Sequence, residues 1–135
     1  MKNNIDIVKD MYGSFLRGDI PAILEHLSAD VEWEHDSVDH GIPWLKPRHG
    51  RQDVVNFFTA LAALDITRFE PVSFLTDKNH VAVPIQIEAR VKNNGRMIRE
   101  LEMHLWTFDQ QQRVTGFRHM VDTHQHWLAL QNQTV

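Results

Sequence analysis

Acidic, basic and aromatic side chains recur at every second position in the last third of the chain. One segment brings Glu100, Glu102, His104 and Trp106. A second segment, which ends in Asp-x-His-x-His, brings Arg118, Met120 and Asp122. On a β-strand, side chains two positions apart share a face. If the two faces meet, acids, bases and one cation line a common space, so the pattern predicts a cavity able to bind a small molecule and suited to proton transfer.

The same segments raise the question of a metal ion. Imidazole and carboxylate groups suit zinc, iron or nickel, and the candidate ligands are His104, His124 and His126. No ligand motif such as HExxH is present, and the alternative is that these histidines are ordinary polar residues at a strand end. We therefore expect no metal and no cofactor.

Composition narrows the class of protein. The 135 residues predict one domain, 1–135. A net charge of −4 with scattered Lys and Arg argues against nucleic acid, which requires a clustered basic face. The absence of cysteine excludes disulfides and thiolate chemistry. No apolar run has transmembrane length and the first residues lack the apolar stretch of a signal peptide, so we expect a cytoplasmic protein without membrane contact.

Apolar periodicity predicts three helices in the first half of the chain. Apolar residues recur at helical spacing through 5–16, and Asp19 begins a second, short helix that closes at 28–30. A third helix begins at Arg51. Between them, 31–35 alternates like a strand, and 36–50 is a long loop of the kind that often carries function.

The second half predicts strands only. Four segments have strand character: 66–75, 81–91, 97–108 and 113–122. Asn94-Gly95 is a strong hairpin signal between the second and third of them. Helices followed by a meander of strands give an α+β fold.

Several local signatures follow one another along the chain. They are Gly18-Asp19-x-Pro21-x-Ile23-x-x-x-Leu27, Asp30-Val-Glu-Trp33, Gly50-Arg-x-x-Val-x-x-Phe57-Phe58, His104-x-Trp106-x-Phe and Phe117-Arg118-x-x-x-Asp122-Thr123. In this order they resemble the NTF2-like superfamily, which includes the ketosteroid isomerases and the SnoaL-like polyketide cyclases. The resemblance extends from about Ile5 to His126.

The resemblance implies a cone: three N-terminal helices packed on a strongly curved, mainly antiparallel sheet, with polar groups deep in an apolar pocket. It also implies a homodimer through the outer face of the sheet. We assign the apolar surface for that dimer to Val81, Val83, Ile85 and Ile87 on one strand and Leu101, Met103 and Leu105 on the next.

The resemblance also implies roles for single residues. Asp122 matches the SnoaL-like acid/base position, His104 resembles its relay or oxyanion partner, and Arg118 would support the charge. The alternative is that Asp122 caps the chain end and pairs with Arg118. His35 stands where ketosteroid isomerases carry their base. The sequence shows no convincing counterpart of their oxyanion-hole tyrosine, because its only tyrosine is Tyr12, in the first predicted helix.

Aromatic residues would wall the cavity. We expect one of Phe57 and Phe58 to face it, namely Phe58, and the other to lie in the core, with Trp44 as a lid residue in the loop. The full set of expected ligand contacts is Trp33, Trp44, Phe58, Trp106, Glu102, Met120 and Glu88.

The hypothesis that follows is an enzyme that performs acid/base proton transfer on a small, apolar, carbonyl-bearing molecule, such as an isomerase, cyclase or lyase. One alternative is a non-catalytic module that binds a ligand in the same pocket. Another is an interaction domain that works through its sheet.

Overall fold

The first two helices begin at side-chain caps that the sequence predicts. The computed structural model describes residues 2–34 and 36–131, and it begins with α1 (Asn4–Leu16), capped by a reciprocal pair of Asn3 and Asp6. The side chain of Asp19 accepts a hydrogen bond from the backbone of Ala22 and starts α2 (Ile20–Leu24). This helix is shorter than predicted, because the chain is already extended at Leu27.

The next strand also differs from its predicted span. β1 (Leu27–Trp33) pairs in parallel with β7 (Val114–Met120) and antiparallel with β2 (Arg48–His49). It ends two residues before the predicted end, because Glu34 adopts a left-handed backbone with φ 59°. His35 lies outside the described residues.

The predicted loop contains some regular structure. It holds a short 3-10 helix, η1 (Pro43–Leu45), whose side chains Trp44 and Leu45 are buried. It also holds β2, which pairs with β1. The helix predicted from Arg51 is confirmed as α3 (Arg51–Leu61), whose buried face includes Val54 and Phe57.

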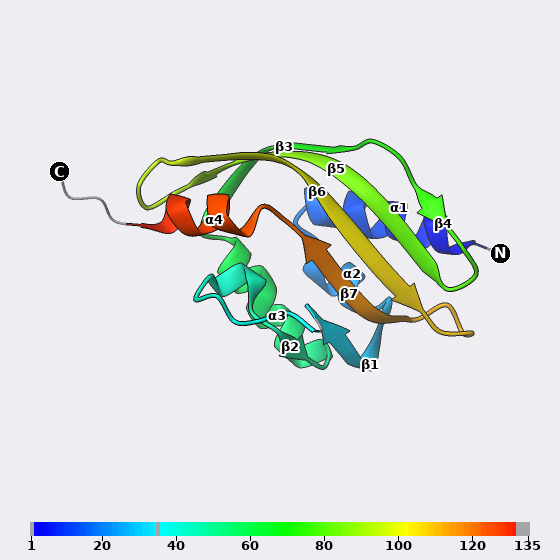
Figure 1. Ribbon diagram of the computed structural model, residues 1–135. Coiled ribbons are helices and arrows are strands. Elements are labelled where there is room, and N and C mark those ends of the chain that lie inside the picture. The colour runs from blue at the N-terminus through cyan, green and yellow to red at the C-terminus, as the bar shows by residue number, and fades with distance from the viewer. Residues whose placement is uncertain (1, 35, 132–135) are drawn as a thin grey trace.

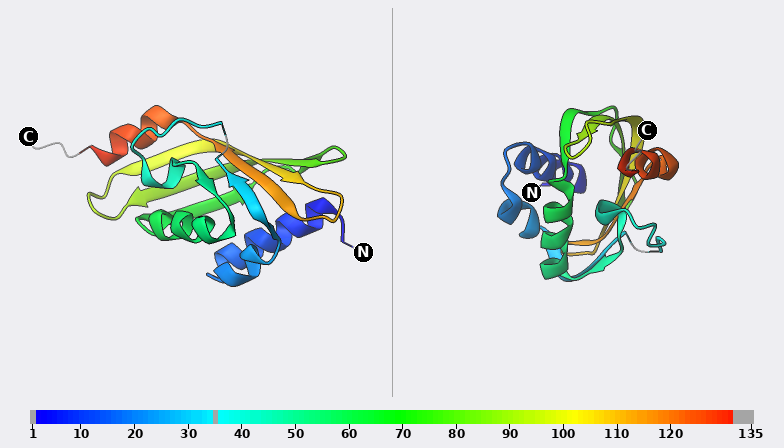
Figure 2. Two further views of the ribbon diagram at one scale, coloured as in Figure 1. Left: turned by 90° about the horizontal axis from the view of Figure 1, so that it is seen from below. Right: turned by 90° about the vertical axis from the view of Figure 1, so that its left-hand side faces the viewer.

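The remaining strands complete a curved sheet of seven strands (Figure 1). They are β3 (Leu64–Pro71), β4 (Leu75–Thr76), β5 (His80–Val91) and β6 (Met97–Phe108), followed by β7. The order is β2-β1-β7-β6-β5-β3, with β4 on β5. The predicted hairpin is confirmed, since Gly95 at φ 76° closes the β5–β6 turn onto Val91. The two views of Figure 2 show the helices gathered on the concave side of the sheet and at one of its ends.

A C-terminal helix was not predicted. The sequence pattern gives an extended segment through His126, but the chain forms α4 (Thr123–Leu130), with the side chain of Asp122 accepting from the backbone of Gln125. Only His126 and Ala129 of this helix are buried, so the helix shows little apolar periodicity. Its N-terminal signal was present nonetheless, as an aspartate followed three residues later by a glutamine.

Strand register decides which side chains share a face. Glu102 pairs with Ile85, His104 with Val83, and Trp106 with Val81. Directly paired residues lie on one face. The apolar residues of β5 therefore point into the concave side, and the predicted dimer surface is wrong for Val81, Val83, Ile85 and Ile87, which are all buried.

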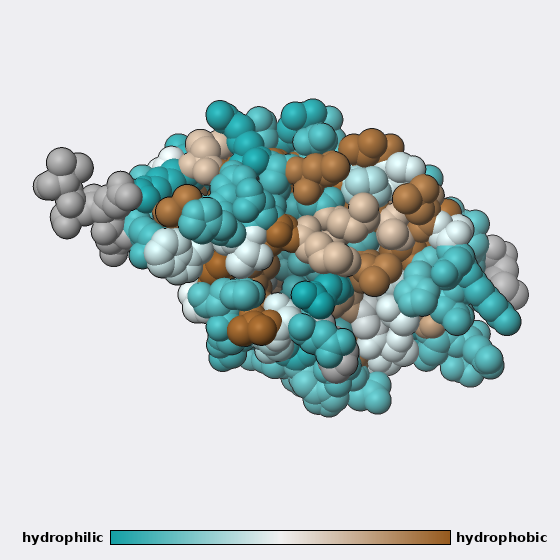
Figure 3. Space-filling view, viewed as in Figure 1, coloured by the Kyte–Doolittle hydropathy of each residue, from teal (hydrophilic) through white to brown (hydrophobic). Residues whose placement is uncertain are grey.

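The β6 residues of the predicted dimer surface, Leu101, Met103 and Leu105, do lie on the outer face of the sheet. Here the exposed or half-buried apolar residues are Leu75, Ala82, Pro84, Leu101, Met103, Leu105 and Met120. They form a continuous hydrophobic area over β5, β6 and β7 (Figure 3). In the described part of the chain, no helix is long and apolar enough to cross a membrane.

Candidate functional site

A cavity opens on the concave side of the sheet, between the sheet, α1 and α3. About 740 Å³ of space is free of protein atoms there, including solvent at the mouth. The wall is mainly apolar and aromatic, with a few ionisable groups at one side. It consists of Met11, Tyr12, Phe15, Ile23, Trp33, Trp44, Phe57, Phe58, Leu61, Leu64, Ile66, Phe69, Ile87, Ala89, Ile98, Glu102, His104, Trp106, Phe117, His119 and His126.

The aromatic wall agrees with the prediction, with one correction. Trp33, Trp44, Phe58 and Trp106 all line the cavity as expected. Phe57 lines it too, so the expectation that only one of the two phenylalanines reaches the cavity is wrong. The two rings contact each other edge to face with centroids 5.0 Å apart, and both are wide enough to reach the cavity from neighbouring positions of α3.

A chain of hydrogen bonds in the cavity wall joins two residues of β6 through one residue of α1. The indole N–H of Trp106 lies 3.0 Å from Tyr12 Oη, which lies 2.9 Å from His104 Nδ1. His104 Nε2 lies 3.5 Å from an oxygen of Glu102, and an ionised carboxylate can only accept, so the proton of the neutral His104 ring is on Nε2. Nδ1 then accepts from the Tyr12 hydroxyl, whose oxygen in turn accepts from the indole N–H of Trp106. Burial lowers the pKa of His104 despite the neighbouring carboxylate, so the ring is neutral.

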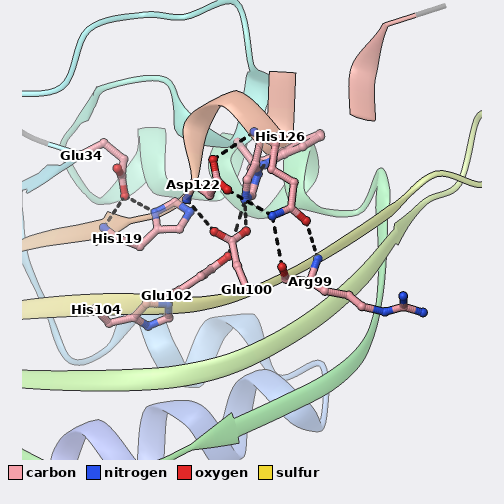
Figure 4. A network of polar contacts seen from close by, with 10 residues as sticks. Glu34, Arg99, Glu100, Glu102, His104, His119, Asp122 and His126 are labelled. Atoms are coloured by element: carbon pink, nitrogen blue, oxygen red, sulfur yellow. Dashed lines mark hydrogen bonds and ion pairs between the residues drawn. The ribbon is translucent and has the colours of Figure 1, made fainter. Parts of the chain in front are cut away.

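A second histidine is biased toward the charged form. His119 donates its backbone N–H to Glu34 Oε1 at 2.9 Å, and its ring Nδ1 bonds the same oxygen (Figure 4). Burial alone would lower the pKa of His119, but the charge and hydrogen bond of Glu34 outweigh it and raise the pKa above its ordinary value. Glu34 thus occupies Nδ1 and favours the imidazolium form, and among the described residues Nε2 of His119 has no hydrogen-bond partner.

A third histidine connects the loop, α4 and β6. His126 Nδ1 accepts from the indole N–H of Trp44 at 2.9 Å, and Nε2 bonds Glu100 Oε2. The other oxygen of Glu100 accepts the backbone N–H of Asp122 at 2.7 Å. Both oxygens of Glu100 are thus occupied by the start and the body of α4.

Glu102 differs from the other two buried carboxylates. It lines the cavity and is 6% exposed, yet its contacts are long: 3.5 Å to His104 Nε2 and 3.8 Å to His126 Nε2. Burial favours its neutral form, but the hydrogen bond from His104 and the charge of His119 outweigh burial, so its pKa lies below the ordinary value. Glu102 is therefore an ionised carboxylate in an apolar cavity, and within the described part of the chain it makes no close hydrogen bond.

The metal hypothesis takes a different form in the structure. His124 is exposed and stacks on Trp127, so it does not join the expected set of His104 and His126. Glu100, Glu102 and His126 instead place one ligand atom each within 4.8 Å of one another. A metal would need the lone pair of His126 Nε2, but the N–H of Trp44 occupies Nδ1 and leaves the ring proton on Nε2. The donor chemistry thus suits a proton at this position better than a metal ion.

Four predicted site residues lie outside the cavity. Asp122 is exposed at the start of α4, and the backbone and side chain of Gln125 lower its pKa, the reverse of the expected effect of burial. On β7, Phe117 and His119 face inward, so Arg118 and Met120 project from the outer face. Glu88 is on the outer face of β5 and pairs with Arg99 at 3.3 Å. His35 lies outside the described residues.

Sequence reasoning missed three polar residues of the site: Glu34, Glu100 as a partner of His126, and His119. Glu34 stood on the polar side of the predicted strand, and only the left-handed turn brings it inward. Simple alternation could have placed His119 on the inner face of its strand, because the apolar residue Phe117 is two positions earlier. The prediction followed Arg118 and Asp122 instead.

Comparisons with known proteins agree with this geometry. A profile of the SnoaL-like domain matches residues 8–117, most of the chain. The chain belongs to the SnoaL-like domain family.

Solved structures place this SnoaL-like chain in the NTF2-like superfamily. An NTF2-like protein of unknown function from Burkholderia pseudomallei K96243 is 25% identical, with a TM-score of 0.85 over 98% of this chain and 100% of that one. An NTF2-like protein from Burkholderia xenovorans LB400 is also 25% identical, with a TM-score of 0.82 over 95% of both chains. A Mycobacterium tuberculosis protein in complex with estradiol-17β-hemisuccinate shares the fold at 14% identity, with a TM-score of 0.70 over 90% of this chain and 95% of that one. Among curated proteins, no sequence match was found.

Proposed function

We propose that this SnoaL-like protein is an acid/base enzyme that binds a small apolar carbonyl compound in the cavity and moves a proton beside the carbonyl group. Glu102 is the base and His119 is the donor to the carbonyl oxygen. The observation that carries the proposal is the pairing of a loosely held carboxylate with an imidazolium in one apolar cavity.

Glu102 suits the role of base. Its carboxylate is ionised, buried and without a close hydrogen bond, so its lone pairs are available to a ligand. The other buried carboxylates are occupied, Glu34 by His119 and Glu100 by His126 and the start of α4. A base in a water-poor cavity needs little solvent reorganisation when it takes a proton.

His119 suits the role of donor. Glu34 keeps the ring charged and fixes its orientation through Nδ1, which leaves Nε2–H for a ligand oxygen. The charges of His119 and Glu102 interact, so they stabilise one another in the free protein. His104 is neutral and bonded on both sides, and we assign it to the positioning of Glu102.

In the proposed step, an oxygen of Glu102 takes a proton from the carbon next to the ligand carbonyl, and the C–H electron pair forms the double bond of an enolate. The enolate oxygen accepts a hydrogen bond from His119 Nε2–H. Where a carbon–carbon double bond of the ligand is conjugated with the enolate, return of the proton to the far carbon of that double bond shifts the double bond and gives an isomer. If the enolate carbon instead attacks a second carbonyl group of the same ligand, a ring forms and the alkoxide takes the proton from Glu102.

The wall of the cavity supports an apolar, ring-bearing ligand. Trp33 and Trp106 lie against Phe117 with centroids 4.3 and 4.4 Å apart, which gives a broad aromatic surface. Trp33 Nε1 is buried and has no hydrogen-bond partner among the described residues, so a ligand acceptor would satisfy it. The M. tuberculosis protein of the same fold, in complex with a steroid derivative, provides a precedent for a ligand of this shape.

Deuterium incorporation tests this function without knowledge of the natural substrate. A panel of cyclic and polycyclic ketones is incubated with the protein in D2O, and mass spectrometry follows exchange at the carbon next to the carbonyl. We expect catalysed exchange for at least one ketone, lost on Glu102→Gln while binding persists. Ketones that bind without catalysed exchange would instead indicate a non-catalytic binding protein.

We also propose a homodimer through the outer face of the sheet. The exposed apolar residues of β4, β6 and β7 on this face, Leu75, Leu101 and Met120, are 55%, 56% and 44% exposed. A continuous apolar surface of this kind is typical of an interface.

A further inference from the structure

One hydrogen bond joins two segments of the cavity wall that are far apart in sequence. Trp44 comes from η1, in the segment between β1 and α3, and His126 comes from α4. The indole Nε1 lies 2.9 Å from His126 Nδ1, and both side chains are almost fully buried, at 1% and 2% exposure. This bond takes no direct part in the proposed proton transfer.

The chemistry of the two rings fixes where the imidazole proton lies. An indole nitrogen can only donate, so Nδ1 of His126 must be the acceptor. Neutral imidazole has one proton, which is therefore on Nε2. Nε2 bonds Glu100 Oε2 and lies 3.8 Å from Glu102 Oε2, so the N–H is directed at the two carboxylates (Figure 4).

The groups around the His126 ring act differently in hydrogen bonds. Among the described residues, the acidic groups facing His126 are Glu100 and Glu102 on β6 and Asp122 at the start of α4, and their carboxylates accept. The indole of Trp44 can only donate. A proton on Nδ1 would point at the Trp44 N–H, donor against donor, and the bond would be lost. Trp44 therefore keeps the ring proton off Nδ1.

We propose that Trp44 is a positioning residue for the acid–base cluster, which holds His126 neutral and its single proton on Nε2, directed at Glu100 and Glu102. This inference rests on the proposed role of Glu102 as the base. A neutral N–H at this distance orients the carboxylate without neutralising it. An imidazolium there would stabilise the carboxylate much more and make it a weaker base. Seating of the 36–50 segment over the cavity thus sets the proton affinity of Glu102.

Nuclear magnetic resonance of the ligand-free protein tests this directly. The 15N shifts of the His126 ring report its tautomer, and the 13C shift of the Glu102 carboxyl reports its titration. We expect Nδ1 unprotonated and Nε2 protonated in the unaltered protein. In Trp44→Phe, Nδ1 should gain a proton and the pKa of Glu102 should fall by about half a unit or more. Trp127→Phe, an exposed tryptophan of α4, is the matched control and should change neither signal.

A conservative variant separates positioning from packing. His126→Gln offers a carbonyl oxygen to Trp44 and an N–H to Glu100, and cannot become charged. It should keep the Glu102 titration close to that of the unaltered protein, whereas His126→Leu should shift it. A proton on Nδ1 in the unaltered protein would overturn the proposal, even if Trp44→Phe did not fold. So would an unchanged Glu102 titration in a folded Trp44→Phe. Because no ligand takes part, the outcome is independent of whether ketone exchange is found.

Discussion

One oxygen of Glu34 accepts both the backbone N–H and the ring Nδ1 of His119, and both side chains are buried. The left-handed backbone at Glu34 turns its side chain toward β7 and makes this contact possible. The buried pair gives the cavity a fixed positive group, and several consequences of that can be measured.

Replacement of Glu34 by Gln should remove the charge of His119. A buried pair that loses one partner typically costs about 3–5 kcal/mol of unfolding free energy. Because the pKa of His119 is raised, its contribution to stability is fully present below about pH 6.5 and is lost as pH rises through the folded-state pKa. Urea unfolding is measured between about pH 5 and pH 9, a range that spans the titration of a histidine. The unaltered protein should lose this stability as pH rises, and Glu34→Gln should not.

Glu32→Gln is the control for that experiment. Glu32 is on β1, two positions before Glu34, and pairs with His49 on the surface, where ion pairs contribute only ~0–1 kcal/mol. Equal losses of stability in the two variants would contradict a special role for the Glu34–His119 pair.

Tyr12→Phe should break the chain of hydrogen bonds from Trp106 to His104. Two buried groups lose their partner, and each unsatisfied group costs about 1–3 kcal/mol. Hydrogen exchange of the Trp106 indole N–H should become faster. Phe69→Leu removes the ring that packs on Tyr12 at 5.2 Å but keeps both hydrogen bonds, so there the indole should remain protected. Equal exchange rates in both variants would mean that packing, and not the hydroxyl, protects this site.

Asp122 should prove to be structural. Asp122→Asn keeps an N-cap oxygen for α4 and should leave stability and ketone exchange nearly unchanged, whereas Asp122→Ala should lower the melting temperature and still exchange. Calorimetry and the deuterium assay measure the two effects. Loss of exchange in a folded Asp122→Asn would restore Asp122 as the base and remove that role from Glu102.

Leu101→Lys on the outer face of β6 should convert the proposed dimer to a monomer, because it places a charge in the apolar interface. Sedimentation equilibrium measures the mass. Leu16→Lys, at the exposed end of α1, is the control and should leave the dimer intact. A monomeric unaltered protein would refute the proposed interface.

Much of the fold could be predicted because local signals and packing agree. Asn3, Asp19 and Gly95 mark caps and a turn whose chemistry is local, and β6 alternates cleanly, so Glu102, His104 and Trp106 were placed on one face correctly. Strand register is not local. The alternation of β5 shows two faces but not which one is inside, so its valines and isoleucines were assigned to the wrong surface.

The chemistry of the site was harder to predict for the same reason. Glu34 reaches His119 only through a left-handed residue at the end of β1, and Glu100 reaches His126 only because α4 folds back on β6. Neither contact follows from periodicity. The family resemblance implies an acid/base role for Asp122, yet Asp122 is the N-cap of the unpredicted helix.

The pH dependence of ketone deuteration tests the central claim most directly. Exchange catalysed by the protein, corrected for the rate without protein, should rise as Glu102 ionises below about pH 4.5 and fall above about pH 6.5 as His119 loses its proton. The acidic rise should disappear, together with nearly all activity, in Glu102→Gln. A rate that continues to rise from neutral to alkaline pH would contradict the account, because it would require a neutral His119 or another base.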